Sequence, residues 1–125
     1  MMETYTRRQT LNKDLEKSYW WIFGGKGGFT RCQIINLLLD RPYNAYQIAQ
    51  KLGKSYNNIK YHLRVLMKEY LIKSDSRQYS AFYYVSKDFN VEIYKKIYKL
   101  IVENEQYLLK RSKLRSLLRR MKKEM

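Results

Sequence analysis

Apolar residues recur at helical spacing in three consecutive stretches of the chain between residues 30 and 70. The first stretch begins at Thr30, a suitable N-cap, and ends at Asp40, because Pro42 disfavours helix in the residue before it. Its expected inward face consists of Ile34, Leu37 and Leu38. We therefore expect the first core helix over residues 30–40.

The second stretch predicts a helix of only two turns, residues 45–52. Asn44 is its expected N-cap, and Gly53 suits a left-handed C-terminal cap. The side chains expected to face inward are Ile48, Ala49 and Leu52. The third helix, residues 56–70, follows with Ser55 as its N-cap. Two helices joined by a tight glycine turn form the helix-turn-helix hairpin of many DNA-binding proteins.

The third helix has two faces of different chemistry. Its apolar stripe, at spacings of three and four residues, consists of Ile59, Leu63, Leu66 and Tyr70. The opposite face carries hydrogen-bond donors, cations and aromatic edges without an acid, on Tyr56, Asn57, Lys60, Tyr61, Arg64 and Lys68. With Ser55 and Asn58, these residues form the predicted DNA-binding face, whose first residues would reach base edges in the major groove while Lys68 meets phosphate. An ordinary solvated face is the alternative, but it would mix Glu with Lys.

A β-hairpin is predicted after the third helix. Residues 71–75 and 80–85 are rich in strand formers, and residues 76–79 between them have the polarity of a turn. This hairpin would be the wing of a winged helix. Arg77 and Gln78 at its tip would reach the minor groove or the flanking backbone, and an ordinary hairpin with an exposed arginine is the alternative.

The N-terminal part begins with a polar arm of mixed charge, residues 1–18. The aromatic run at residues 19–23 predicts a strand or a short helix, and the glycine-rich residues 24–28 predict a flexible turn. A Walker A loop is not indicated, because the required glycine spacing and Lys-Ser/Thr pair are missing. The glycines would nevertheless let backbone N–H groups approach a DNA phosphate, with Lys26 adding charge.

The last segment, residues 91–125, predicts a long helix with a heptad seam. One column of the seam contains Ile93, Leu100, Tyr107, Leu114 and Met121. The companion column contains Ile97, Asn104, Arg111 and Leu118. Further apolar residues broaden the first half, which would pack on the winged domain or on a partner helix: Tyr94, Ile101 and Leu108. We expect dimerisation through this helix, with parallel and antiparallel pairing both open.

Residues 110–123 of this helix carry eight Lys and Arg and no acid. Nearby phosphates would make such a density of charge tolerable, and each phosphate neutralised would steepen the salt dependence of DNA binding. A frayed, solvated tail and an amphipathic helix on an anionic membrane are the alternatives.

Charge and composition favour a nucleic-acid partner. The 125 residues have room for one domain with a modest core, and 26 Lys plus Arg against 11 Asp plus Glu give a formal net charge of +15. No apolar run is long enough to cross a membrane, and residues 1–15 lack the apolar core of a signal peptide. We expect a cytoplasmic protein associated with the nucleoid and no membrane partner.

Catalytic and metal chemistry have little support in the sequence. Its one cysteine, Cys32, and one histidine, His62, cannot supply a metal site of three or four ligands, and the acids are scattered. We therefore expect no enzyme activity, no cofactor and no metal. Cys32 is expected to be a small buried residue rather than a redox sensor. His62 is expected to be a partly buried structural residue, with a phosphate contact as the alternative.

The residues that define the helices and the first wing strand occur in a distinctive order: Thr30-Arg31 through Leu37-Leu38, Arg41-Pro42-Tyr43-Asn44-Ala45, Ile48-Ala49, Leu52-Gly53, Ser55-Tyr56, Ile59, His62-Leu63, Leu66 and Leu71-Ile72. In order and spacing, over roughly residues 20–87, the chain resembles an archaeal ArsR-type winged-helix regulator. The resemblance implies a compact helix-turn-helix with a wing, which usually dimerises. Metal-sensing members of that family use clustered Cys, His and acidic residues, and this sequence departs from them there.

The expected fold is mainly α with a small β-hairpin, divided into an arm (1–18), a winged helix-turn-helix domain (19–87) and a C-terminal helix with a basic end (88–125). The expected function is that of a sequence-specific regulator of transcription that binds double-stranded DNA as a homodimer. Its recognition helix, residues 55–70, would enter the major groove, and its wing, residues 72–85, would lie on the flank. An abundant architectural protein that coats DNA with little sequence preference is the alternative.

Overall fold

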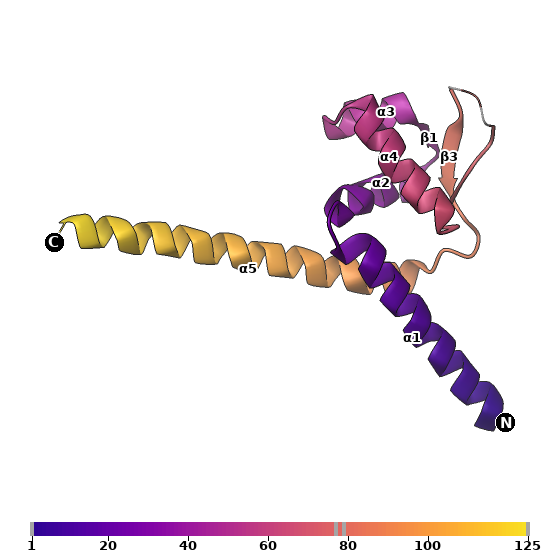
Figure 1. The fold of residues 1–125 in the computed structure, drawn as a ribbon, viewed down its shortest axis with the longest axis horizontal. Coiled ribbons are helices and arrows are strands. Elements are labelled where there is room, and N and C mark those ends of the chain that lie inside the picture. Colours follow the sequence, from indigo (N-terminus) through magenta and orange to yellow (C-terminus); the bar gives the residue numbers. More distant parts are fainter. Residues whose placement is uncertain (1, 77, 79, 125) are drawn as a thin grey trace.

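The computed structural model describes residues 2–76, 78 and 80–124, which form a winged helix-turn-helix followed by a long C-terminal helix (Figure 1). The elements in chain order are α1 (Met2–Gly24), α2 (Gly28–Asp40), β1 (Tyr43–Asn44), α3 (Ala45–Leu52), α4 (Tyr56–Lys68), β2 (Ile72–Ser74), β3 (Phe82–Val85) and α5 (Val91–Glu124). The antiparallel sheet has the order β1-β3-β2. The mainly α fold with a wing is confirmed, and β1, which pairs Tyr43 with Tyr83, is an addition that its two-residue length hides in the sequence.

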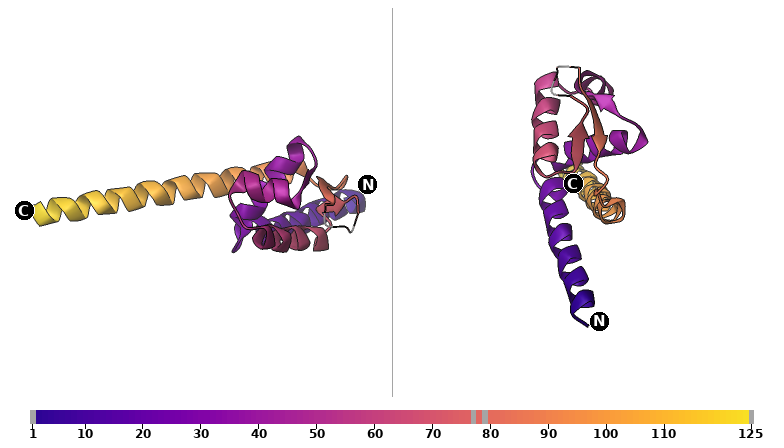
Figure 2. Two further views of the ribbon diagram at one scale, coloured as in Figure 1. Left: turned by 90° about the horizontal axis from the view of Figure 1, so that it is seen from above. Right: turned by 90° about the vertical axis from the view of Figure 1, so that its right-hand side faces the viewer.

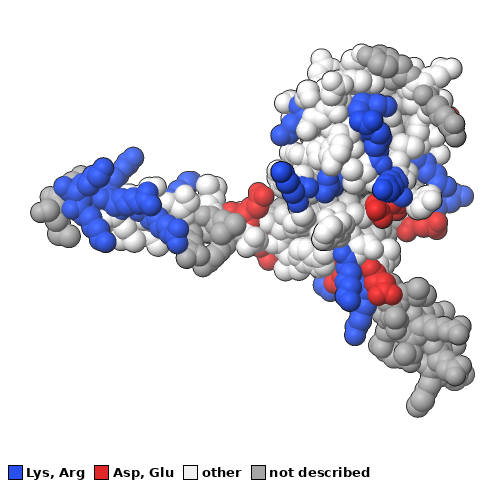
Figure 3. All heavy atoms as spheres, viewed as in Figure 1, with Lys and Arg blue, Asp and Glu red and all other residues white. Residues whose placement is uncertain are grey.

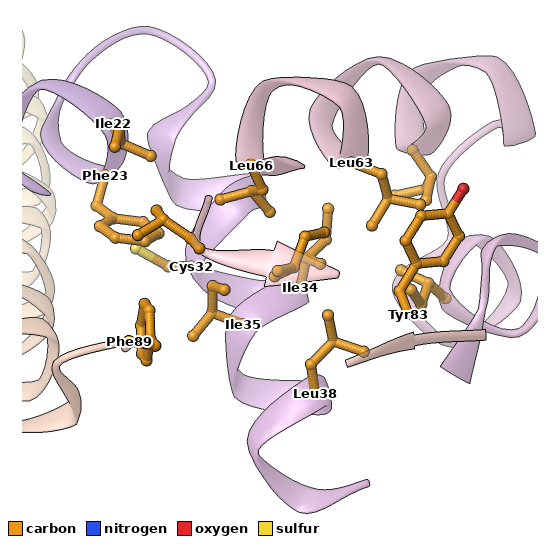
Figure 4. Close-up of a cluster of buried hydrophobic side chains, with 14 of the residues drawn as sticks. Ile22, Phe23, Cys32, Ile34, Ile35, Leu38, Leu63, Leu66, Tyr83 and Phe89 are labelled. Carbon is orange, nitrogen blue, oxygen red and sulfur yellow. The ribbon is translucent and has the colours of Figure 1, made fainter. Parts of the chain in front are cut away.

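The core lies where α2 meets α3, α4 and the sheet. Figure 4 shows Ile34, Ile35 and Leu38 of α2 between two groups of side chains, one from α1 and the segment before α5 and the other from α4 and β3. The largest side chains of the inner face have 5% or less of their surface exposed, which is the burial expected of a packed interior: Ile34, Ile35, Leu38, Ile48, Ile59, Leu63, Leu66 and Tyr83. Helix α2 is therefore the central element of the domain.

The ends of α3 and the start of α4 form as their capping residues predict. Asn44 accepts a hydrogen bond from the backbone N–H of Gln47 (2.8 Å), and its own N–H donates to the Gln47 side chain (3.0 Å), a complete capping box. Gly53 ends α3 in the left-handed conformation, with φ 64°. The Ser55 hydroxyl accepts from the backbone N–H of Asn58 (3.1 Å).

Helix α2 starts earlier than the sequence predicts. It begins at Gly28 with Gly27 as N-cap, so the prediction of Thr30 as cap is wrong. Gly28 is buried against the last turn of α1, where an added Cβ would overlap the carbonyl oxygen of Phe23. Its N–H also donates to the Gly25 carbonyl (2.9 Å). The glycines thus make a tight connection between two helices rather than a flexible turn, because only they allow so close an approach.

Helix α1 runs across residue 18, where the sequence suggests a boundary. The aromatic run forms the last turns of this helix and not a strand, with Tyr19, Ile22 and Phe23 buried at spacings of three and four residues. Tyr19 stacks on Phe89, with ring centroids 5.5 Å apart. Trp21 on the opposite side is 83% exposed. The segment expected to be an arm is thus, over its described residues, the beginning of this helix.

Helix α4 ends two residues before the predicted boundary. Tyr70 adopts a left-handed conformation (φ 60°) and is 81% exposed, so its assignment to the apolar stripe is wrong. The N–H of Leu71 donates to the Leu66 carbonyl (3.1 Å) and that of Tyr70 to Met67 (3.0 Å), the pattern of a Schellman end. This turn brings Leu71, instead of Tyr70, into the core.

Helices α1 and α5 form a second layer beneath the winged domain. Tyr94 and Ile97 of α5 are almost fully buried, and the backbone N–H of Asn90 donates to the Tyr19 hydroxyl (2.8 Å). Lys96 and Glu16 add a surface ion pair at 2.9 Å. Beyond this contact α5 projects away from the domain (Figures 1 and 2). Part of the first half of the predicted seam thus packs within the protomer, because Ile97 is buried in the hydrophobic core of the same chain.

We predict that Gly28→Ala is far more destabilising than Gly53→Ala. The first change forces a methyl group into the backbone of α1 and should cost at least about 3 kcal/mol, the upper range for overpacking. The second meets no atom within 4 Å and should cost about 1–2 kcal/mol for its left-handed backbone. Urea unfolding of both variants measures the difference, and equal losses would contradict the tight α1–α2 connection.

We also predict that Cys32 is unreactive in the folded protein. The side chain is fully buried, and burial raises the pKa of its thiol from 9.0 to about 11. At pH 8 only about one thiol in a thousand would then be the reactive thiolate. Alkylation by iodoacetamide should be at least about a hundredfold slower in buffer than in denaturant. Comparable rates under the two conditions would favour the redox-sensor alternative.

Candidate nucleic-acid interface

One row of side chains faces directly away from the core along α4. It consists of Asn57, Tyr61, Arg64 and Lys68, spaced four, three and four residues apart and all exposed. The buried residues Ile59, Leu63 and Leu66 lie on the other side of the helix. The row therefore presents an amide, a phenol and two cations to solvent, with no acid among them.

Two of the predicted site residues are half-buried at the side of α4 that faces the wing. The ammonium group of Lys60 donates to the hydroxyl of Tyr83 on β3 (3.0 Å), and this hydrogen bond raises the pKa of Lys60. Tyr56 stacks on Tyr46 of α3, with ring centroids 4.6 Å apart. Lys60 is thus a link between α4 and the wing as well as a surface cation.

The remaining predicted residues lie at the start of α4 and on the wing. Ser55 is exposed but its hydroxyl serves as the helix cap, whereas the side chain of Asn58 is exposed beside the outward row. Gln78 is exposed near the tip of the wing. Arg77 lies outside the described residues. The structure therefore brings the α4 residues together, while the contribution of the wing tip stays a prediction.

A residue that sequence reasoning missed packs against the flank of α4 that faces away from the wing. Arg31 of α2 is only 6% exposed, and its guanidinium approaches Nδ1 of His62 at 3.2 Å. His62 is 5% exposed, so it is more deeply buried than the partly buried structural histidine that the sequence predicts. Burial and the Arg31 charge lower the pKa of His62. The available signal was that Arg31 precedes Ile34, Ile35 and Leu38 on the inward face of α2.

Cations are unevenly distributed over the molecular surface. Figure 3 shows Lys and Arg on the face that carries α4 and, most densely, on the far half of α5, whereas acids lie where α5 leaves the domain, at the lower edge of the domain and beside α1. Among the described residues no group of three His, Cys, Asp or Glu side chains is arranged to hold a metal ion. None of the helices, as far as they are described, has the length and apolar content needed to cross a membrane.

An open, mainly apolar groove runs between the start of α2 and the middle of α5. Its lining residues are Phe29, Tyr98, Val102, Glu105, Gln106 and Leu109. Further along α5 the side chains of Leu114, Leu117, Leu118 and Met121 are each more than half exposed. Such continuous apolar exposure on a projecting helix is typical of a surface that contacts another macromolecule.

Comparison with known families links the same segment to transcription regulators. The sequence model of the family described as "Bacterial regulatory protein, arsR family" matches residues 29–74, from the first turn of α2 to the end of β2. A comparison with curated proteins finds no match. The helix-turn-helix and the first wing strand, which contain the outward row of α4, are therefore the part that this family shares.

Solved structures share the fold at low sequence identity. The transcriptional repressor BigR from Xylella fastidiosa is 12% identical, with a TM-score of 0.57 over 84% of this chain and 97% of that chain. The homodimeric winged helix-turn-helix DNA-binding domain Mb0332 from Mycobacterium bovis, a possible ArsR-family regulator, is 17% identical, with a TM-score of 0.51 over 82% and 88%.

ZitR from Lactococcus lactis is 23% identical, with a TM-score of 0.48 over 63% of this chain, and the chain spans 56% of its length. BigR and Mb0332 show that the winged-helix fold is shared. The similarity to the arsR family thus lies in residues 29–74, which hold the helix-turn-helix and the first wing strand.

Proposed function

We propose that this protein is a transcription regulator that binds double-stranded DNA in a sequence-specific manner. The observation that carries the proposal is the acid-free outward row of α4 on the second helix of a helix-turn-helix. The arsR-family match over residues 29–74 supports it independently. In proteins of this architecture the corresponding helix enters the major groove.

The chemistry of the row suits base reading at one end and backbone contact at the other. The Asn57 amide can make two hydrogen bonds to adenine, and the Arg64 guanidinium can do so to guanine. Lys68 lies three turns from Asn57 and would meet phosphate. From residue 57 to 68 the helix rises about 16 Å, which is the length of about five base pairs. Residues Ser55, Tyr56, Asn58 and Lys60 would contact DNA beside this row.

The wing, residues 72–85, would lie on the flank of the same site. The hydrogen bond between Lys60 and Tyr83 ties β3 to the recognition helix, so that the two elements would approach DNA as one body. Arg77 and Gln78 at the wing tip would contact the minor groove or backbone. The cationic end of α5 would add phosphate contacts to the general affinity.

We further propose a homodimer that forms through α5. The far half of this helix carries four adjacent exposed apolar side chains, Leu114, Leu117, Leu118 and Met121, which a second copy would cover. The Mb0332 domain, which shares the fold, is homodimeric. Two recognition helices related by a twofold axis would read an approximately palindromic site.

A DNA-coating architectural protein is the second candidate, favoured by the net charge of +15 alone. The two functions differ in the ratio of specific to non-specific affinity, which is typically a thousandfold or more for a site-specific regulator. An archaeal source and a cytoplasmic location at the nucleoid stay predictions of the sequence, as do the absence of enzyme activity and of metal sensing.

Selection of bound fragments from a random DNA pool tests the proposal. We expect a recovered palindrome that binds far more tightly than its scrambled version at near-physiological salt. Arg64→Ala should then cost about 1–3 kcal/mol on the palindrome and much less on scrambled DNA, because it removes a base contact. Lys68→Ala is the matched control and should weaken both DNAs alike while lowering the salt slope by about one. Equal affinity of the wild-type protein for both DNAs would favour the architectural function.

The dimer is tested by two variants that add the same charge to opposite sides of α5. Leu118→Glu should dissociate the dimer, because a symmetric interface would lose two buried leucines worth about 1.5–3 kcal/mol each and gain two charges. Ser116→Glu, which lies on the other side of the helix from Leu118, should leave it intact. Sedimentation equilibrium measures the dissociation constants. A dimer that resists Leu118→Glu, or one that Ser116→Glu disrupts equally, would place the interface elsewhere.

A further inference from the structure

Arg31 is a buried cation that joins three parts of the molecule. Its Nε donates to the carbonyl oxygen of Ile22 near the end of α1 (2.8 Å), and its Nη2 donates to the carbonyl of Lys26 in the glycine connection (3.0 Å). Its Nη1 lies 3.2 Å from Nδ1 of His62 in the recognition helix. One side chain of α2 thus contacts α1, the connection after it and α4.

This guanidinium has no carboxylate partner within the described part of the chain, where Lys96–Glu16 is the one ion pair. The carbonyls at the end of α1 carry the partial negative charge of a helix C-terminus, which stabilises a cation there. The Nη1 atom of Arg31, which bonds neither of these carbonyls, faces the imidazole ring of His62. A buried charge needs such polar neighbours, because an unsatisfied one is costly.

The geometry requires a neutral His62 with a defined tautomer. A guanidinium can only donate hydrogen bonds, so Nδ1 of His62 has to accept and its proton has to lie on Nε2. A protonated imidazole would instead direct a second N–H at the Arg31 cation. The charged or titratable groups around His62 are Arg31 from α2, Lys54 from the turn before α4 and the neighbouring Tyr61, and none of them is an acid.

Arg31 and His62 lie so close to the backbone of residue 27 that this position has no room for a side chain. Gly27 has φ 77°, and an added Cβ would come within 2.8 Å of Cε1 of His62 and 3.1 Å of Nη1 of Arg31. The recognition helix therefore packs directly on the backbone between α1 and α2. A shift of His62 in this contact would move α4 relative to α1 and the layer that α1 forms with α5.

We propose that Arg31 and His62 are positioning residues that hold the recognition helix against the end of α1, and that protonation of His62 releases this contact. The inference rests on the proposed role of α4 in reading DNA. Its consequence is that site-specific DNA binding weakens at mildly acidic pH. Binding to scrambled DNA should stay equal or become tighter, because the extra positive charge on the protein favours phosphate contact.

The direction of the pH effect follows from the two protonation states. Burial and the neighbouring cations lower the pKa of His62 in the folded protein below the ordinary value of 6.5. The unfolded chain therefore binds the proton more readily than the folded protein. The contribution of neutral His62 to the free energy of unfolding is fully present above pH 6.5, and it is lost as the pH falls through the lower pKa of the folded protein. At a given pH, His62 is protonated in a smaller fraction of the folded protein than of the unfolded chain. We expect the loss of specific DNA binding to be proportional to that folded, protonated fraction.

The experiment compares wild type with His62→Asn on the selected DNA and its scramble at pH 7.5 and 5.0. Asn keeps an oxygen acceptor near the place of Nδ1 but has no proton to gain. For wild type we expect the ratio of specific to non-specific affinity to fall at least about threefold at pH 5.0, because the proton that His62 gains on acidification releases its contact with Arg31. His62→Asn should keep its ratio constant over this range. Thermal melts at both pH values establish that each protein is folded.

A second measurement does not depend on DNA or on a variant. Nitrogen NMR of the wild-type imidazole at pH 7.5 should show a neutral ring protonated at Nε2. A ring protonated at Nδ1 would overturn the inference, and so would an equal pH response of wild type and His62→Asn in specific binding. No preference of wild type for the selected DNA at pH 7.5 would instead overturn the proposed function together with this inference.

Discussion

Ile59, Leu63 and Leu66 of α4 are buried against the centre of the domain, and this contact decides which side of α4 faces solvent. Because the apolar stripe occupies one side, Asn57, Tyr61, Arg64 and Lys68 have to form a single row on the other. Losing one of the buried leucines would cost about 2–5 kcal/mol and would also loosen this orientation. Packing and proposed DNA reading are therefore two consequences of the same helix periodicity.

The two flanks of α4 are held by different chemistry. On the wing side a surface cation, Lys60, donates to Tyr83. On the other side a buried cation, Arg31, binds the end of α1 and approaches His62. Since α1 packs on the first part of α5, whose far half we propose for dimerisation, α4 is connected to the proposed dimer interface through α1 and α5. This arrangement would link the spacing of the two recognition helices to the contact between protomers.

Local signals in the sequence predict most of the domain, and tertiary contacts explain the rest. The caps at Asn44, Gly53 and Ser55 and the stripe up to Leu66 depend on neighbouring residues, so they could be predicted. The start of α2 at Gly28 depends on the approach of α1, and the exposure of Tyr70 depends on a turn that selects Leu71 for the core. The position of Arg31 on the inward face of α2 could signal its burial, but its role could not be predicted, because its partners are two backbone carbonyls and the imidazole of His62, which leave no pattern of charge.

Dimethyl sulfate footprinting on the selected DNA separates the proposed mode of binding from its alternatives, since the reagent methylates N7 of guanine in the major groove and N3 of adenine in the minor groove. With α4 in successive major grooves, guanine N7 should be protected in two patches about one helical turn apart. Wild-type protein that leaves every guanine N7 reactive while protecting adenine N3 alone would contradict the assignment of α4 as the recognition helix.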